Sequence, residues 1–253
     1  MSDKPFEGIG AVYFDLDDTL CGYWIAASKA LRETLELHGP KHIHVDQMVD
    51  HWAAAFRELI SVIRQKPWYK TYLNQSDLGR TEQMRMTLAR AELDDEAMAA
   101  AMSRHYMEAR DRHLELFPDA IAVLDKLKLQ FPLGLITNGP ADIQRMEIST
   151  LAIESYFDNI FIEGEMGFGK PEPEVFRRAA AAVSLPPEKL LFVGNSYLHD
   201  ILPAIEAGWK TAWIKRASDV PPSSGKSAPE ERPTDKPAPD AEIGSLSELL
   251  ELL

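Results

Sequence analysis

Short apolar runs alternate with helical patterns along most of this chain, and this alternation constrains its fold more than any other feature. The runs are rich in β-branched and aromatic residues and occupy residues 11–16, 133–137, 159–163, 190–194 and 210–214. Near-continuous hydrophobicity is typical of parallel strands that are buried on both faces. Helical patterns lie between the later runs, at residues 120–129, 142–151, 174–182 and 200–207. The order predicts an α/β fold with a doubly wound parallel sheet, whose ligands bind outside the carboxyl ends of the strands.

The stretch between the first two predicted strands is far longer than an ordinary crossover. Its apolar spacing predicts about four helices, over residues 23–37, 46–65, 75–91 and 94–112, with Asp46, Ser76 and Asp94 as N-caps. We therefore expect a helical domain at residues 21–113, inserted into a core that residues 1–20 and 114–253 form. The insertion holds three of the five tryptophans, at positions 24, 52 and 68, and burial of its helices explains most of them.

The predicted core carries a segment of different composition near its end. Residues 218–240 hold six of the 17 prolines, mixed with Ser, Lys and Glu, which favours an extended, mobile loop. The chain closes with a leucine-rich stretch at residues 245–253, where Ser245 is a candidate N-cap of a short helix.

Composition excludes several classes of function. Lys and Arg number 27 against 40 Asp and Glu, a net charge of −13, so a nucleic acid is not an expected partner. The single cysteine, Cys21, cannot form an internal disulfide, which fits a reducing compartment. No apolar run reaches the roughly 18 residues of a membrane span, and the first residues are polar. We expect a cytoplasmic protein with no membrane partner.

Two aspartates stand at the end of the first predicted strand. Asp15 and Asp17 are two residues apart, so in an extended chain they share a face and enter one small space. Two carboxylates at such a short distance repel each other unless a cation separates them or one of them holds a proton. One can then be a nucleophile and the other a proton shuttle, whereas loop acids on a solvated strand end are the plainer interpretation.

Polar residues stand at or just after the ends of the other predicted strands as well. Thr137 and Asn138 precede a glycine and can hold an anionic oxygen, although they also form a turn signal. Lys170, between a glycine-rich bend and two prolines, is either a fixed cation at the sheet edge or a solvated surface lysine. Asn195 and Asp200 can supply oxygen to a hard cation such as Mg²⁺, and Asp200 can alternatively cap a helix.

The order and spacing of these residues resemble the haloacid dehalogenase superfamily of phosphohydrolases. Residues 15–20, Asp-Leu-Asp-Asp-Thr-Leu, match its first motif, Thr137-Asn138 its second, Lys170-Pro171 its third, and Gly194-Asn195 through Asp200 its fourth. The resemblance covers the core, about residues 9–20 and 115–216. By position and length, the insertion is similar to the helical cap of the first type.

The resemblance implies a role for each matched residue. Asp15 would attack phosphorus and form an aspartyl-phosphate, and Asp17 would protonate the leaving oxygen and then activate water. Thr137 and Lys170 would complete the catalytic set. The phosphoryl group would be bound by the side chains of Thr137 and Lys170 and by backbone N–H groups near Leu16, Asp17 and Asn138. The implied cofactor, Mg²⁺, would take oxygens of Asp15, the Asp17 backbone, Asn195 and Asp200.

One residue departs from the family pattern. Phosphatases of the family usually carry Asp after the motif-four glycine, where this chain has Asn195, so one negative charge is missing from the metal site. Asp17 favours phosphomonoester hydrolysis over dehalogenation, because a departing alkoxide needs a proton. A phosphotransferase or mutase, and a catalytically weakened phosphate-binding regulatory protein, stay open as alternatives.

The sequence reveals little about the substrate. A small-molecule phosphate ester is the expected partner, and the oligomeric state is not predicted. Arg57, Arg80 and Arg85 in the insertion are candidates to meet a second anionic group, although a solvated helix face explains them as well.

Overall fold

The protein, in a computed structural model that describes residues 4–63, 69–221 and 230–253, is built on one parallel sheet. Its strands are β1 (Ala11–Phe14), β2 (Leu133–Thr137), β3 (Asn159–Ile162), β4 (Leu190–Gly194), β5 (Lys210–Ile214) and β6 (Ala241–Ile243). They pair in the order β3-β2-β1-β4-β5-β6, and every neighbouring pair is parallel. The order reverses at β1, between β2 and β4. In open α/β sheets ligands bind at such a reversal, outside the carboxyl ends of the strands.

Helices fill the connections. Between β1 and β2 lie α1 (Tyr23–His38), α2 (Val45–Ile63), α3 (Tyr69–Asn74), α4 (Ser76–Arg90) and α5 (Glu96–His113), followed by α6 (Ala120–Lys128). The later helices are α7 (Ala141–Thr150), α8 (Glu163–Met166), α9 (Pro173–Val183), α10 (Leu202–Glu206) and α11 (Leu246–Leu252). Short turns are η1 (Glu154–Tyr156), η2 (Pro187–Lys189) and the π-helical η3 (Tyr197–Ile201).

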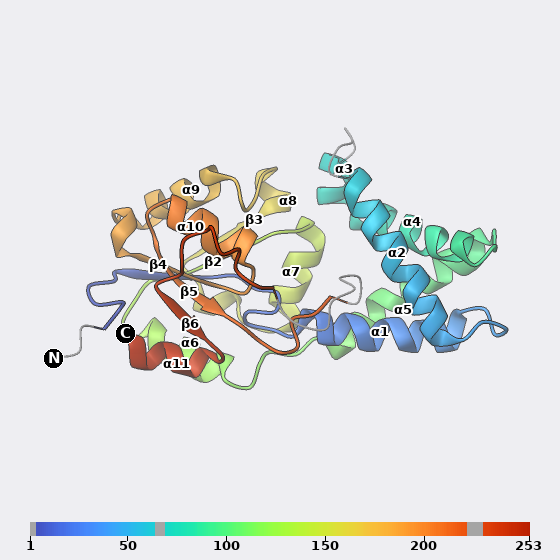
Figure 1. Ribbon diagram of the computed structural model, residues 1–253, viewed down its shortest axis with the longest axis horizontal. Helices are drawn as coiled ribbons and strands as arrows, with labels where there is room; N and C mark the ends of the chain where they lie inside the picture. Colours follow the sequence, from blue (N-terminus) through green and yellow to red (C-terminus); the bar gives the residue numbers. More distant parts are fainter. Residues whose placement is uncertain (1–3, 64–68, 222–229) are drawn as a thin grey trace.

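Both faces of the sheet are buried. Along β1, Val12 and Phe14 point to a core with residues of α6 and α11, whereas Ala11 and Tyr13 point to the opposite core with Phe176 of α9. This alternation is the period of two expected of a strand. Figure 1 shows α6 and α11 on one side of the sheet and α9 and α10 on the other. The predicted doubly wound α/β sheet is therefore confirmed.

Helices α1 to α5 gather at one end of the molecule, beyond the carboxyl edge of the sheet (Figure 1). Helices α1, α2, α4 and α5 share their own hydrophobic core, in which Leu31, Trp52, Leu88 and Tyr106 are buried together. We call these five helices the cap. The predicted helical insertion after the first strand is confirmed, while its exact boundaries at residues 21 and 113 stay a prediction.

Several local predictions need correction. Strand β1 ends at Phe14, because the chain turns into a loop at Asp15. The N-cap of α5 is Asp95, whose carboxylate accepts from the Met98 amide, and not Asp94. Ser76 lies inside the first turn of α4. Strand β6 and helix α3 are too short for their apolar periodicity to predict them.

The described residues do not include Trp68, residues 64–65 at the end of the predicted helix 46–65, or residues 222–229 of the proline-rich segment. The flanking parts of that segment contact the core, since Tyr197 donates a 2.6 Å hydrogen bond to the carbonyl of Pro237. In the described part of the chain, no helix is both long and apolar enough to cross a membrane.

Candidate active site

The carboxyl ends of four strands bring the predicted site residues to one edge of the sheet. Asp15 directly follows β1, Thr137 is the last residue of β2, and Asn195 directly follows β4. Lys170 lies between α8, which follows β3, and α9. Because parallel strands all end on the same edge, residues more than a hundred positions apart in sequence become neighbours.

Lys170 lies between two buried carboxylates. Its Nζ is 2.6 Å from Asp15 Oδ1 and 2.7 Å from Asp200 Oδ1, and all three side chains are almost fully buried. Burial lowers the pKa of the Lys170 ammonium, but the two carboxylates outweigh it, so its pKa is raised overall. Lys170 therefore stays a cation, and the solvated-lysine interpretation is wrong.

The nucleophile candidate has an altered acidity. Burial raises the pKa of Asp15 to about 7; the Lys170 charge opposes this shift and Asp200 adds to it. Burial also raises the pKa of Asp17, against the hydrogen bond that Gln144 donates to it. An acid that holds its proton more readily than a surface aspartate suits proton donation to a leaving group.

Gln144 of α7 connects two of the predicted residues. Its Nε2 donates to Asp17 Oδ2 at 3.2 Å, and its Oε1 accepts from the Thr137 hydroxyl at 2.5 Å. The same Nε2 also donates to Glu147 at 2.9 Å. Gln144 and Glu147 are three residues apart and thus face the site from one side of the helix. Gln144 therefore fixes the orientation of the Asp17 carboxyl.

Behind Gln144 lies a buried ion pair between cap and core. Arg110 of α5 is 3.1 Å from Glu147 of α7, and both side chains are almost wholly buried. Burial raises the pKa of Glu147 well above its usual range, and the nearby Asp17 charge raises it further. A buried charge needs a partner to remain in place, so this pair ties the position of the cap to the residues that hold Asp17.

Asn138 holds the backbone of the lysine. Its Nδ2 donates to the Lys170 carbonyl at 2.6 Å, and its Oδ1 accepts from the Lys170 amide at 2.8 Å. A Cβ at Gly169 would lie 2.5 Å from Asn138 Oδ1, so only glycine leaves room for this pair of bonds. The side chain of Asn138 thus positions Lys170. Leu16, one of the three residues with a predicted backbone contribution, buries its side chain in the core.

Motif four contributes a carboxylate and an amide. Asp200 Oδ2 accepts from the Ser196 amide at 2.9 Å, and a Cβ at Gly194 would lie 2.5 Å from that same oxygen. Glycine is thus required for Asp200 to reach Lys170. The Asn195 oxygen accepts from the Thr19 hydroxyl at 3.3 Å, and this hydroxyl is also 3.1 Å from Asp15 Oδ2.

The side-chain oxygen atoms at this edge are suitable ligands for a hard cation. The side-chain donors are the carboxylates of Asp15 and Asp200 and the amide oxygen of Asn195, and through Thr19 the amide oxygen lies close to Asp15. An all-oxygen set is the chemistry that Mg²⁺ prefers. Within the described ranges, no three His, Cys, Asp or Glu side chains gather into a metal-binding cluster.

A cavity of about 360 Å³ opens between the cap and this edge. Its core side is lined by Asp17, Asn138 and Asn195, and its cap side carries aromatic residues and two arginines, Arg80 and Arg110. The volume is in the range of small-molecule pockets. A ligand in this cavity would have one end at Asp17 and the rest against the cap.

Several residues of the site carried no clear sequence signal as functional groups. They are Thr19, inside the first motif but without an assigned role, Gln144 and Glu147 on α7, Arg110 in the cap, and Asp219 after β5. Only Gln144 and Glu147 are indicated by a sequence pattern, because their spacing places them on one face of the helix that follows Thr137.

Sheet order, helical insertion and motifs define a hydrolase of the haloacid dehalogenase type, and comparison with known proteins agrees. The model of the haloacid dehalogenase-like hydrolases matches residues 12–214. The chain belongs to this family, as its motifs predict.

Its relatives by sequence are phosphatases. N-acylneuraminate-9-phosphatase of Rattus norvegicus is 27% identical over 248 residues, which cover 97% of this chain and 94% of the relative. Glyceraldehyde 3-phosphate phosphatase of Methanopyrus kandleri is 30% identical over 247 residues, 97% of each protein. Among solved structures, a HAD-hydrolase of Bacillus subtilis bound to magnesium has a TM-score of 0.70 at 22% identity, covering 97% of this chain and 98% of that one. The structural likeness shows that the fold is shared.

Proposed function

We propose that this chain is a Mg²⁺-dependent phosphomonoester hydrolase that acts on a small phosphorylated metabolite through Asp15. The observation that carries the proposal is the contact of Asp15 with Lys170 at 2.6 Å, at the edge of a cavity that Asp17 lines. The phosphatase activity of the relatives supports the same reaction.

In the first step, an Asp15 oxygen attacks phosphorus. A bond forms between that oxygen and phosphorus as the bond from phosphorus to the ester oxygen breaks, and Asp17 gives its proton to the departing alkoxide. Lys170 offsets the charge of the transferring phosphoryl group from a fixed position. Gln144 keeps the Asp17 carboxyl in place through its 3.2 Å hydrogen bond.

In the second step, water attacks the aspartyl-phosphate. Asp17, now deprotonated, accepts a proton from the water as the water oxygen bonds to phosphorus. The bond between phosphorus and the Asp15 oxygen breaks, which releases Asp15. Asp15, Asp200, Asn195 and the backbone carbonyl of Asp17 would hold Mg²⁺, which when bound offsets negative charge on the phosphoryl oxygens. The cap covers the cavity and reduces the access of bulk water to the intermediate.

A cytoplasmic location fits the buried, unpaired thiol of Cys21, which a reducing compartment preserves. The alternative of a weakened phosphate-binding protein is favoured by Asn195 alone. A phosphotransferase would share the first step and differ in the acceptor.

Turnover of p-nitrophenyl phosphate tests the proposal. We expect hydrolysis that requires Mg²⁺ and stops on chelation, and Asp15→Asn should reduce kcat on the order of 10³-fold or more while thermal unfolding stays cooperative. Asp94→Asn, which changes an exposed aspartate of the cap, is the matched control and should leave kcat unchanged. Near-native kcat in Asp15→Asn, or a folded wild-type protein that hydrolyses no phosphate ester, would overturn the assignment. Transfer of phosphate to an added alcohol faster than to water would favour the phosphotransferase.

A further inference from the structure

The cap side of the 360 Å³ cavity carries N–H donors that lack acceptors in the described structure. They are Trp52 Nε1, Arg80 Nε, Gln83 Nε2 and Arg110 Nε, and all four side chains line this one cavity. Trp52 and Arg110 are 2% exposed and Gln83 7%. A buried donor without an acceptor destabilises the free protein. All four nitrogens are shielded from solvent, so they are unused hydrogen-bonding capacity in the wall of one cavity, and a ligand with oxygen acceptors can use it when these side chains turn toward it.

These donors lie on the wall opposite the reacting edge. Trp52 comes from α2, Arg80 and Gln83 from α4, and Arg110 from α5, whereas Asp17 lies on the core side of the cavity. A phosphate ester with its phosphorus at Asp15 would extend its alcohol part toward the cap. The donors therefore face the leaving group and not the phosphate.

The two arginines differ in how their charge is balanced. Arg110 has a buried partner, Glu147, at 3.1 Å. Arg80, whose side chain is 13% exposed, pairs with Asp77, which is 88% exposed. An ion pair with such an exposed carboxylate contributes little, and Asp77 does not line the cavity, so an anionic group of a ligand can compete for Arg80.

The acids of the cavity are held on its core side. Asp17 accepts from Gln144, and Glu163 accepts from the Tyr69 hydroxyl at 2.6 Å and from the Gly139 amide at 3.0 Å. Asp18 accepts from the Trp24 amide at 3.2 Å. The acids at the core and the weakly paired Arg80 at the cap favour a ligand whose second anionic group points into the cap.

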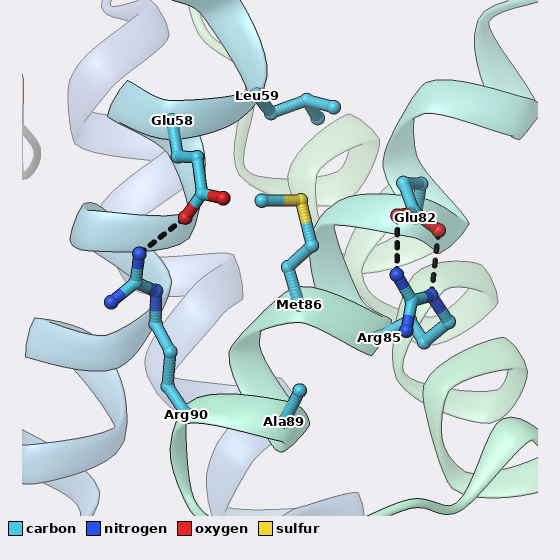
Figure 2. Close-up of a pocket in the computed structure, with 7 residues that line it drawn as sticks. All are labelled: Glu58, Leu59, Glu82, Arg85, Met86, Ala89 and Arg90. Atoms are coloured by element: carbon cyan, nitrogen blue, oxygen red, sulfur yellow. Dashed lines mark hydrogen bonds and ion pairs between the residues drawn. The ribbon is translucent and has the colours of Figure 1, made fainter. Parts of the chain in front are cut away.

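A second pocket lacks these properties. It has a volume of about 460 Å³ and lies between α2 and α4, where Figure 2 shows Arg85 paired with Glu82 and Arg90 paired with Glu58. The carboxylates that pair with these two arginines line the same pocket, so a ligand there would meet both charges of each pair. This pocket provides no comparable anion site, but it provides Arg85 as a control on the same helix as Arg80.

We propose that Arg80, with Trp52, Gln83 and the Nε of Arg110, binds a carboxylate and hydroxyl oxygens on the leaving group. The substrate class is a phosphorylated hydroxy acid, in preference to the neutral sugar or polyol phosphate of the same size. Aromatic side chains such as Trp24 and Tyr106 line the rest of the cavity and suit the carbon chain of such a molecule. This inference rests on the proposed phosphatase function.

A matched pair of esters tests it. 6-Phosphogluconate and sorbitol 6-phosphate share a six-carbon polyol chain and differ at carbon 1, where one has a carboxylate and the other an alcohol. We expect kcat/KM to favour the acid by about tenfold or more, since a charge-assisted contact is worth at least one factor of ten. Arg80→Met should bring the ratio of the two kcat/KM values close to one. General losses of activity cancel in this ratio.

Further variants keep the test decisive. Gln83→Leu should lower the ratio of the two kcat/KM values by a smaller factor. This variant replaces Arg80→Met as the test if Arg80→Met does not fold. Arg85→Met should leave the ratio at its wild-type value. A wild-type ratio near one, with normal turnover of p-nitrophenyl phosphate, overturns the inference and leaves the proposed function standing. A wild-type preference that Arg80→Met does not change overturns the role of Arg80, whereas absent turnover of every ester overturns the proposed function itself.

Discussion

The side-chain amide of Asn195 donates a 2.8 Å hydrogen bond to the carboxylate of Asp219, in the loop after β5. This bond determines which end of the amide faces the site, because the Asn195 oxygen is left to accept from Thr19 beside Asp15. The negative charge that motif four lacks at position 195 is therefore present one side chain further out. Burial raises the pKa of Asp219 to about 6, and the bond from Asn195 opposes this shift.

This relationship changes the expected effect of restoring the family's usual acid. From sequence alone, Asn195→Asp should tighten Mg²⁺ binding about tenfold, because it adds a charge-assisted contact. In the structure, the new carboxylate would face Asp219, so repulsion replaces a hydrogen bond. We expect Asn195→Asp to bind Mg²⁺ no more tightly than wild type, and Asn195→Asp with Asp219→Asn to bind it about tenfold more tightly than Asn195→Asp alone.

Calorimetric titration of Mg²⁺ into the substrate-free protein measures both variants without relying on activity. Asp219→Asn alone is the control for loss of the outer charge. If Asn195→Asp alone already binds Mg²⁺ tenfold more tightly than wild type, Asp219 does not restrain position 195.

The buried pair of Arg110 and Glu147 leads to a prediction on stability. Arg110→Met leaves the Glu147 carboxyl buried without its partner at 3.1 Å, and breaking such a pair costs about 3–5 kcal/mol. Arg110→Met with Glu147→Leu removes both charges and should recover most of the loss. Urea unfolding measures each variant. Arg112→Met, on the same helix but half-exposed, should have little effect. A loss in Arg110→Met as small as in Arg112→Met would contradict this account of the pair.

Gln144 should affect chemistry more than binding. Gln144→Leu removes the donor to Asp17 and the acceptor for the Thr137 hydroxyl, so the proton donor is no longer held in one orientation. We expect kcat to fall by roughly tenfold to a hundredfold with a small change in KM, since misplaced catalytic groups cost rate. Steady-state kinetics with p-nitrophenyl phosphate separates the two parameters. A rise in KM at constant kcat would instead make Gln144 a substrate-binding residue.

The sequence predicted the fold and the position of the candidate site at the carboxyl ends of the strands, because both follow from local patterns of apolar and polar residues. Asp15, Thr137 and Asn195 each stand at the end of an apolar run, and the fold rule that ligands bind at strand ends brings them together. The pairing of Asn195 with Asp219 depends on a loop path that no periodicity encodes. The donors of the cap cavity come from three helices, and only their packing shows that Trp52 and Gln83 face one space. Sequence patterns therefore do not predict contacts between side chains that are far apart in the sequence.

Movement of the cap relative to the core is the last prediction. The chain enters and leaves the cap side by side, where the Gly22 amide donates to the Glu115 carbonyl at 3.0 Å, so both connections can bend about one line. Away from these connections, the Ser76 hydroxyl donates to Asp142 at 2.6 Å, which links α4 of the cap to α7 of the core. Replacing that carboxylate should weaken the closed arrangement.

Spin labels at Leu78→Cys in α4 and Leu129→Cys after α6 report the distance between cap and core, because both positions are exposed and Cys21 is buried. We expect a broad distance distribution for the free protein that narrows when Mg²⁺ and orthovanadate, a mimic of the phosphoryl group, are added. Asp142→Ala should broaden the distribution and raise the vanadate concentration needed to narrow it, because closure then has one bond fewer to stabilise it. Asp125→Ala, which changes an acid of α6 remote from the cap, is the control and should behave like the unsubstituted labelled protein. A distribution that is the same with and without vanadate would mean that the cap is fixed and that ligands reach Asp15 by another opening of the cavity.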